Sequence, residues 1–126
     1  MSSIRPSVRG LVAGLALFAS AAAFAHPKLV SATPADHATV AAPASINLTF
    51  SETLLPVSGA ELTLTKMPGM EMPPMKIEAK AAPSKDAKSL LLTPSRPLIA
   101  GTYRVDWHVV STDTHAVKGQ FEFTVK

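Results

Sequence analysis

Apolar and polar residues alternate along several short runs of this chain. The clearest run is 101–110, which has large apolar side chains at odd positions from 103 and the polar residues Arg104, Asp106 and His108 between them. Successive side chains of an extended chain point to opposite faces, so a period of two predicts strands with one buried face. Trp107 belongs to the apolar side and is predicted to be a core residue. The runs predicted as strands are 27–32, 45–50, 60–66, 75–79, 89–92, 101–110 and 117–125.

Prolines separate these runs. They fall between the runs or at their ends, where a missing backbone N–H breaks no ladder hydrogen bond. No run has helical spacing, and the sequence contains no internal repeat. Seven short strands in about 100 residues predict one all-β domain, an immunoglobulin-like sandwich.

The first 25 residues have the composition of a secretory signal peptide. Arg5 and Arg9 precede an apolar stretch at 11–24, and Ala23 and Ala25 stand at the two positions that a signal peptidase reads. About 14 apolar residues are too few for a bilayer core, which needs roughly 20. We expect a cleaved Sec-type signal peptide at 1–25, export to the periplasm, and a mature domain at 26–126 that does not insert into a membrane.

The composition of the chain excludes several kinds of site and partner. The chain has no cysteine, which excludes disulfide scaffolds, thiolate metal sites and cysteine nucleophiles. The formal charge is +3, but removing Arg5 and Arg9 leaves 10 basic and 9 acidic residues. A nearly neutral domain gives no reason to expect nucleic acid or anionic lipid as a partner.

Cleavage after Ala25 would make His26 the first residue. A free N-terminal histidine offers its α-amine and its imidazole Nδ1 to one metal ion, closing a six-membered chelate ring. Two neutral nitrogen donors suit a square-planar ion, Cu(II) before Ni(II) in the Irving–Williams order. The α-amine has an ordinary pKa near ~8, so a metal displaces its proton readily at neutral pH. The alternative is that the residue type at this position is incidental.

A second cluster is Asp113-Thr114-His115. On an extended chain, residues two apart point to the same face, so a carboxylate and an imidazole could close on one ion. The alternative is an ordinary turn, because residues 111–114 have turn composition. Whether this cluster meets His26 in space is not visible in the sequence.

A third cluster contains four of the five methionines, Met67, Met70, Met72 and Met75. The prolines and the glycine among them exclude a helix, so these residues form no helical core stripe. Uncharged soft sulfur favours Cu(I) over Zn(II) or Ca(II). The alternatives are a hydrophobic loop and a partner-binding surface. The remaining histidines, His37 in a turn and His108 on a polar strand face, are expected to face solvent.

Six stretches carry a resemblance to a known family. They are His-Pro-Lys-Leu at 26–29, Thr-Pro-Ala-Asp at 33–36, Leu-Thr-Phe-Ser-Glu at 48–52, Ser-Gly-Ala-Glu-Leu at 58–62, Gly-Thr-Tyr-Arg-Val-Asp-Trp at 101–107 and Ser-Thr-Asp-Thr-His-Ala-Val-Lys-Gly at 111–119. Together they resemble the periplasmic copper-binding proteins of the CopC/PcoC type. The resemblance implies a small Greek-key β-barrel or sandwich of cupredoxin-like type that carries copper and is not an enzyme.

The resemblance also implies ligands. In that family Cu(II) is held by the N-terminal histidine, through amine and ring, and by the Asp and His of the Asp-x-His stretch. The matching residues here are His26, Asp113 and His115, with Glu52 in or next to the site. Some members add a Cu(I) site in a Met-rich loop, which the four methionines match. Members with the full Cu(I) site usually include a histidine in that loop. None lies between Met67 and Met75, so weaker Cu(I) binding is expected.

The expected function is a periplasmic copper carrier or buffer for homeostasis or resistance. It would exchange copper with a membrane copper transporter or with another periplasmic copper protein. Two other classes stay open at this stage. One is a copper oxidase or monooxygenase with a histidine brace, and the other is a metal-free immunoglobulin-like adhesion or chaperone module.

Overall fold

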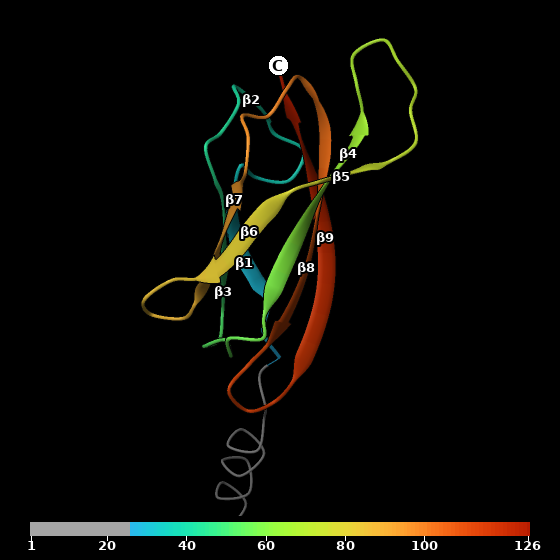
Figure 1. Cartoon of the computed structure of the whole chain (residues 1–126). Helices are drawn as coiled ribbons and strands as arrows, with labels where there is room; N and C mark the ends of the chain where they lie inside the picture. Colours follow the sequence, from blue (N-terminus) through green and yellow to red (C-terminus); the bar gives the residue numbers. More distant parts are fainter. Residues whose placement is uncertain (1–25) are drawn as a thin grey trace, which may run out of the picture.

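A computed structural model describes residues 26–126, and the predicted signal peptide lies outside the described residues. The described chain is all-β and forms two sheets (Figure 1). Its strands are β1 (Leu29–Thr33), β2 (Thr39–Val40), β3 (Ile46–Phe50), β4 (Gly59–Lys66), β5 (Met75–Ile77), β6 (Ala79–Pro83), β7 (Ser89–Pro94), β8 (Gly101–Val110) and β9 (Ala116–Val125). The all-β prediction is confirmed.

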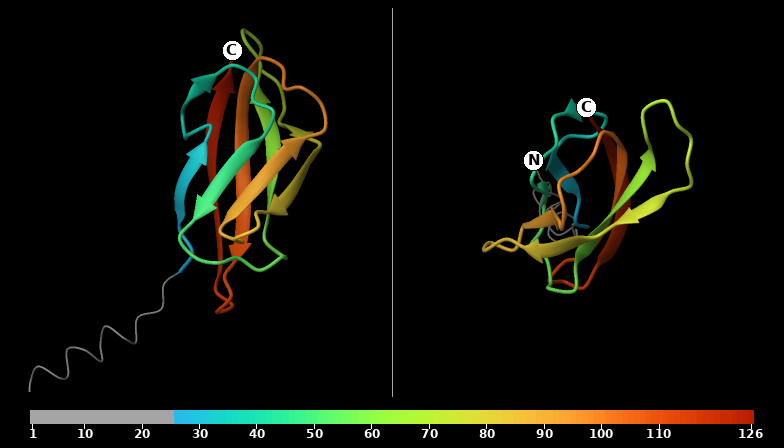
Figure 2. Two further views of the ribbon diagram at one scale, coloured as in Figure 1. Left: turned by 90° about the vertical axis from the view of Figure 1, so that its left-hand side faces the viewer. Right: turned by 45° about the horizontal axis from the view of Figure 1, so that its top comes forward.

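The two sheets pack face to face around one apolar core (Figure 2). One sheet has the order β1-β3-β7-β6, and the other has the order β2-β9-β8-β4-β5. Alternate residues of the central strands point inward, as their period of two predicts. The core includes Trp107, which is 9% exposed, so its prediction as a core residue is confirmed. The other large buried side chains come from the same alternation and include Phe50, Leu62, Leu92, Tyr103 and Phe123.

Two segments pass from one sheet to the other and close the sides of the sandwich. On one side, β1 pairs with β3, and the chain then crosses to pair β2 in parallel with β9. On the other side, β5 pairs with β4, and β6 directly afterwards pairs with β7. Both sides are therefore bridged by a continuous piece of chain, which gives the sandwich a barrel-like form.

These crossings explain why the described chain has nine strands where the sequence predicts seven. The predicted strand 75–79 is split between β5 and β6, because the chain changes sheets at Glu78. The alternation continues through this point and does not reveal the crossing. The second addition, β2, was missed because it is only two residues long, and so short a strand has no detectable period.

The loops at the two ends of the sandwich carry the candidate residues. The start of β1 and the β8–β9 loop lie at one end (Figures 1 and 2). The β4–β5 loop projects at the opposite end, where the chain also terminates. No segment within residues 26–126 forms a helix long and apolar enough to cross a bilayer.

Candidate metal centre

His26 is held at the end of the sandwich by the residues that follow it. Pro27 is fully buried, although His26 itself is exposed. The backbone N–H of Lys28 donates to the Ser51 hydroxyl at 2.9 Å, and the N–H of Ser51 donates back to the Lys28 carbonyl at 2.9 Å. This reciprocal pair fastens the start of the described chain to the residue that follows β3.

The segment after β3 then connects to the β8–β9 loop. Leu54 forms an isolated bridge with Ser111, and the N–H of Thr112 donates to the Thr53 carbonyl at 3.1 Å. Glu52, which is half-buried, lies in this connecting segment. Backbone hydrogen bonds therefore bring three separate parts of the sequence to one end of the molecule.

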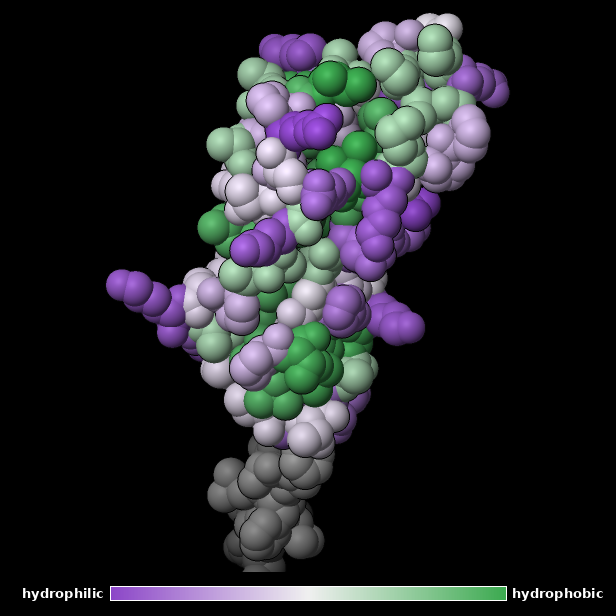
Figure 3. All heavy atoms as spheres, viewed as in Figure 1, coloured by the Kyte–Doolittle hydropathy of each residue, from purple (hydrophilic) through white to green (hydrophobic). Residues whose placement is uncertain are grey.

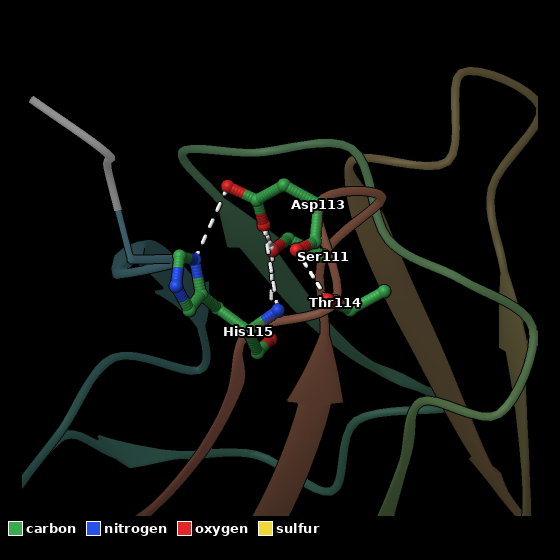
Figure 4. A network of polar contacts seen from close by, with 4 residues as sticks. All are labelled: Ser111, Asp113, Thr114 and His115. Atoms are coloured by element: carbon green, nitrogen blue, oxygen red, sulfur yellow. Dashed lines mark hydrogen bonds and ion pairs between the residues drawn. The ribbon is translucent and has the colours of Figure 1, made fainter. Parts of the chain in front are cut away.

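The β8–β9 loop turns tightly at the Asp-x-His stretch. Thr114 has φ of 70°, the left-handed region that a β-branched residue rarely adopts. The stretch is therefore a turn, which was the alternative interpretation of its sequence, and not an extended chain. The two side chains nevertheless meet, because Oδ2 of Asp113 lies 3.2 Å from Nδ1 of His115 (Figure 4).

His26 and His115 approach each other across the same end. Their ring centroids are 4.7 Å apart and the rings are inclined by 80°. The side chains of His115 and Asp113 are 36% and 40% exposed, although the Nδ1 atom of His115 is itself buried. The structure therefore brings His26 close to the Asp113–His115 pair, from which it is remote in the sequence.

The distances between these donors can be compared with the coordination geometry of a transition metal. Nitrogen and oxygen donors lie about 2.1 Å from such a metal, so two donors at right angles are about 3 Å apart. The 3.2 Å between Asp113 Oδ2 and His115 Nδ1 is compatible with neighbouring positions around one ion. Among residues 26–126, no three His, Asp or Glu side chains already converge on a common point. A complete site therefore requires a further donor or a small rearrangement.

Ser111 also takes part in the candidate site, although its sequence context did not identify it. Its hydroxyl donates a hydrogen bond to Oδ1 of Asp113 (Figure 4). This bond is the main reason that the pKa of the Asp113 carboxyl is lowered; partial burial opposes the shift, and the backbone N–H of His115 adds to it. The Ser-x-Asp spacing was the available signal, because serine and aspartate side chains often form local hydrogen bonds within turns.

The four methionines lie in and beside the β4–β5 loop, at the opposite end. The loop closes on itself through the Met70 N–H, which donates to the Met67 carbonyl at 3.1 Å, with Gly69 at φ of 66°. Met67 and Met72 are half-buried and pack against the core, whereas Met70 and Met75 are 55% and 52% exposed. In Figure 3 this projecting loop shows a mixture of weakly hydrophobic and weakly hydrophilic surface.

The other two histidines lie elsewhere. His37 is in the turn between β1 and β2, where its Nε2 is 3.4 Å from Oδ2 of Asp36 and its side chain is 75% exposed. His108 is exposed on the outer face of β8, and its ring covers Gly59 of β4. Both face solvent, as the sequence predicts.

The structure is a small β-sandwich with imidazole and carboxylate groups gathered at one end, an arrangement that suits a metal-binding domain. Comparison with known proteins identifies the family. Residues 29–126 match the family described as the CopC domain, and the chain belongs to that family. It is 63% identical to copper resistance protein C of Xanthomonas campestris pv. juglandis, over the whole of both chains. It is 52% identical to copper resistance protein C of Pseudomonas syringae pv. tomato, over 87% of this chain and 88% of that one. The resemblance found in the sequence is confirmed.

Solved structures support the same conclusion. The chain superimposes on the crystal structure of PcoC, a methionine-rich copper resistance protein from Escherichia coli, with a TM-score of 0.73 and 52% identity, covering 81% of this chain and all of that one. The crystal structure of CopC from Methylosinus trichosporium OB3b gives a TM-score of 0.65 at 30% identity, covering 80% of this chain and 94% of that one. Both fold and sequence thus relate the chain to copper proteins.

Proposed function

We propose that the processed protein is a periplasmic copper carrier or buffer that serves copper resistance or homeostasis. Cu(II) binds to the α-amine and Nδ1 of His26 together with Asp113 and His115, and Glu52 lies beside the site. The protein exchanges this copper with a membrane copper transporter or with another periplasmic copper protein. Copper is the cargo here and not a resident cofactor of catalysis.

The observation that carries this proposal is the approach of His26 to the Asp-x-His turn. The two imidazoles are 4.7 Å apart, and the Asp113 carboxylate is 3.2 Å from His115. In the unprocessed chain the backbone nitrogen of His26 is part of a peptide bond and carries a proton that a metal does not readily displace at neutral pH. Removal of the signal peptide frees this nitrogen as a further donor beside the side chains, which by themselves form no complete site within residues 26–126.

Cu(I) binding at the methionines is a second part of the proposal. Thioether sulfur is a soft, uncharged donor that prefers Cu(I). The exposure of Met70 and Met75 supports access of the ion to the loop. Without a histidine in the loop, the site consists of thioethers alone and holds Cu(I) weakly, which suits transfer better than storage.

A carrier fits the site better than an oxygen-activating enzyme. Asp113 as a ligand would take the position around copper that oxygen needs. In addition, a domain of this size offers little surface for a polymeric substrate. Sustained substrate oxidation by the copper-loaded, reduced protein in air would favour the enzyme and contradict a carrier.

The proposal is tested by changing the N-terminus. Three proteins are compared: one that begins at His26, the same protein with its α-amine acetylated, and His26→Ala. Both altered proteins lose the chelate ring. Loss of a residue that only orients a ligand typically lowers metal affinity by up to about 100-fold. Because a ligand itself is lost here, we expect the Cu(II) affinity of both altered proteins to fall by more than that. Competition with a chelator measures the affinity, and electron paramagnetic resonance counts the nitrogen ligands.

His37→Ala is the matched control, because it removes an exposed histidine that lies in another turn. We expect it to leave Cu(II) binding unchanged. If the acetylated protein binds Cu(II) as tightly as the processed one, the α-amine is not a ligand and the proposed centre is wrong.

A further inference from the structure

Ser111 is buried at the point where β8 ends and the candidate loop begins. It is 1% exposed, although it is a polar residue at the edge of an open loop. Its N–H donates to the His115 carbonyl at 3.0 Å, and its carbonyl accepts from the Thr114 N–H at 2.8 Å. Its bridge to Leu54 joins the loop to the segment after β3. The backbone of Ser111 therefore closes the loop that carries the proposed ligands.

The side chain of Ser111 has a separate role. A buried hydroxyl needs a hydrogen-bond partner, and that of Ser111 donates to Oδ1 of Asp113. The other acceptor nearby, the His115 carbonyl, is 3.4 Å away and offers a much weaker bond. Because the hydroxyl engages one oxygen of the carboxylate, it sets the rotation of that group. The remaining oxygen, Oδ2, then lies 3.2 Å from Nδ1 of His115 (Figure 4).

We propose that Ser111 is a positioning residue for Cu(II), which holds the Asp113 carboxylate so that Oδ2 is presented beside Nδ1 of His115. This inference rests on the proposed Cu(II) site and names the residue that preorganises it. Asp113 is 40% exposed, and without this bond its carboxylate would keep only the longer bond from the His115 N–H at 3.4 Å and the contact with His115 Nδ1. Partners that orient a ligand in this way typically change metal affinity 10- to 100-fold.

Ser58 provides a matched comparison for a purely structural role. It is also buried, at 7% exposure, and it bonds to the same end of β8. Its hydroxyl accepts from the Val110 N–H at 2.9 Å and donates to the Val110 carbonyl at 3.4 Å. Loss of this hydroxyl loosens the end of β8 next to Ser111 but removes no bond to Asp113.

The test uses the processed protein and four variants, Ser111→Ala, Ser111→Thr, Ser58→Ala and Asp113→Asn. Cu(II) affinity is measured by competition, the ligand field by electron paramagnetic resonance, and folding by thermal unfolding. We expect Ser111→Ala to weaken Cu(II) binding about 10-fold or more and to alter the copper hyperfine coupling. Ser111→Thr keeps the hydroxyl and should restore both. Ser58→Ala should stay within about twofold of the wild type at equal or greater loss of thermal stability.

A measurement without copper gives an independent readout. Three-bond Hα–Hβ couplings of Asp113 report its side-chain rotamer in the metal-free protein. We expect one rotamer in the wild type and in Ser58→Ala, and averaging over several in Ser111→Ala. This readout and the Ser58 control decide the question even if Ser111→Thr does not fold.

Each contrary outcome has a distinct meaning. Unchanged Cu(II) binding in Ser111→Ala, or an equal loss in Ser58→Ala, overturns the positioning role. If Asp113→Asn weakens binding and Ser111→Ala does not, only the inference about Ser111 fails. If Asp113→Asn has no effect, the proposed ligand set is wrong and the role of Ser111 falls with it.

Discussion

Trp107 lies across Gly119, its partner in the register of β8 and β9. A Cβ atom at Gly119 would come within 2.2 Å of Cζ2 of Trp107, so the indole fills the space that any other residue would need. The ring also meets Phe50 of the opposite sheet in a T-shaped contact, with centroids 5.1 Å apart. A glycine at this one position therefore lets a single indole join the two sheets.

Gly119→Ala is expected to lower the free energy of unfolding by about 1–3 kcal/mol, because the added methyl group must displace a packed indole. Urea unfolding followed by Trp107 fluorescence measures this change. Gly59→Ala is the control, since its new Cβ would meet only the ring of His108 at 3.1 Å, and that exposed side chain can turn away. An equal loss in both variants would contradict the role assigned to the indole.

At the scale of elements, two long strands separate the candidate sites. β8 and β9 pair from Gly101↔Val125 to Val110↔Ala116 without a register shift. A strand of ten residues, as in β8, spans roughly 33 Å. The β8–β9 loop ends this ladder on one side, and the β4–β5 loop projects at the other end (Figure 1). The two loops are therefore expected to bind metal independently.

Replacing Met67, Met70, Met72 and Met75 together by leucine is expected to abolish Cu(I) retention and to leave Cu(II) affinity unchanged. Leucine keeps the volume and the apolar character that the half-buried Met67 and Met72 contribute to the core, so the fold should persist. Anaerobic competition with a Cu(I) chelator measures the loss, and Cu(II) competition on the same sample serves as the control. Loss of both ions in a folded variant would indicate one shared site.

For the molecule as a whole, pH acts differently on the carboxylate and on the nitrogen donors at the end that carries His26, Asp113 and His115. The hydrogen bond from Ser111 keeps the pKa of Asp113 below its ordinary value. A lowered folded-state pKa means that the ionised carboxylate stabilises the fold above the ordinary pKa. This contribution is lost only as the pH falls through the lowered value. The nitrogen donors behave differently, because they must be deprotonated to bind a metal.

Lowering the pH from about 7 to 5 is therefore expected to release Cu(II) from a protein that stays folded. Protons compete with copper for the nitrogen donors, whereas Asp113 is still ionised. Copper absorption and circular dichroism measured along one titration separate release from unfolding. Release that begins only below about pH 4, together with unfolding, would show that carboxylates and not nitrogens hold the ion.

Part of the fold was predictable because its cause is local. The alternation in 101–110 and 117–125 corresponds to β8 and β9, and the predicted core position of Trp107 is confirmed. The crossing at Glu78 was not predictable, because a strand that changes sheets keeps its period of two. The two residues of β2 carry no period, and their pairing with β9 depends on a distant segment.

The candidate ligands were likewise identifiable by residue type, and their copper chemistry stays a prediction that experiments must test. What the sequence alone determined is the set of donors and the alternating strands that support them, since both follow from side-chain chemistry and local geometry. Only the tertiary structure decided that His26 faces His115 and that the methionines lie at the far end. These relations arise from backbone pairing between segments remote in the chain, which no local pattern records.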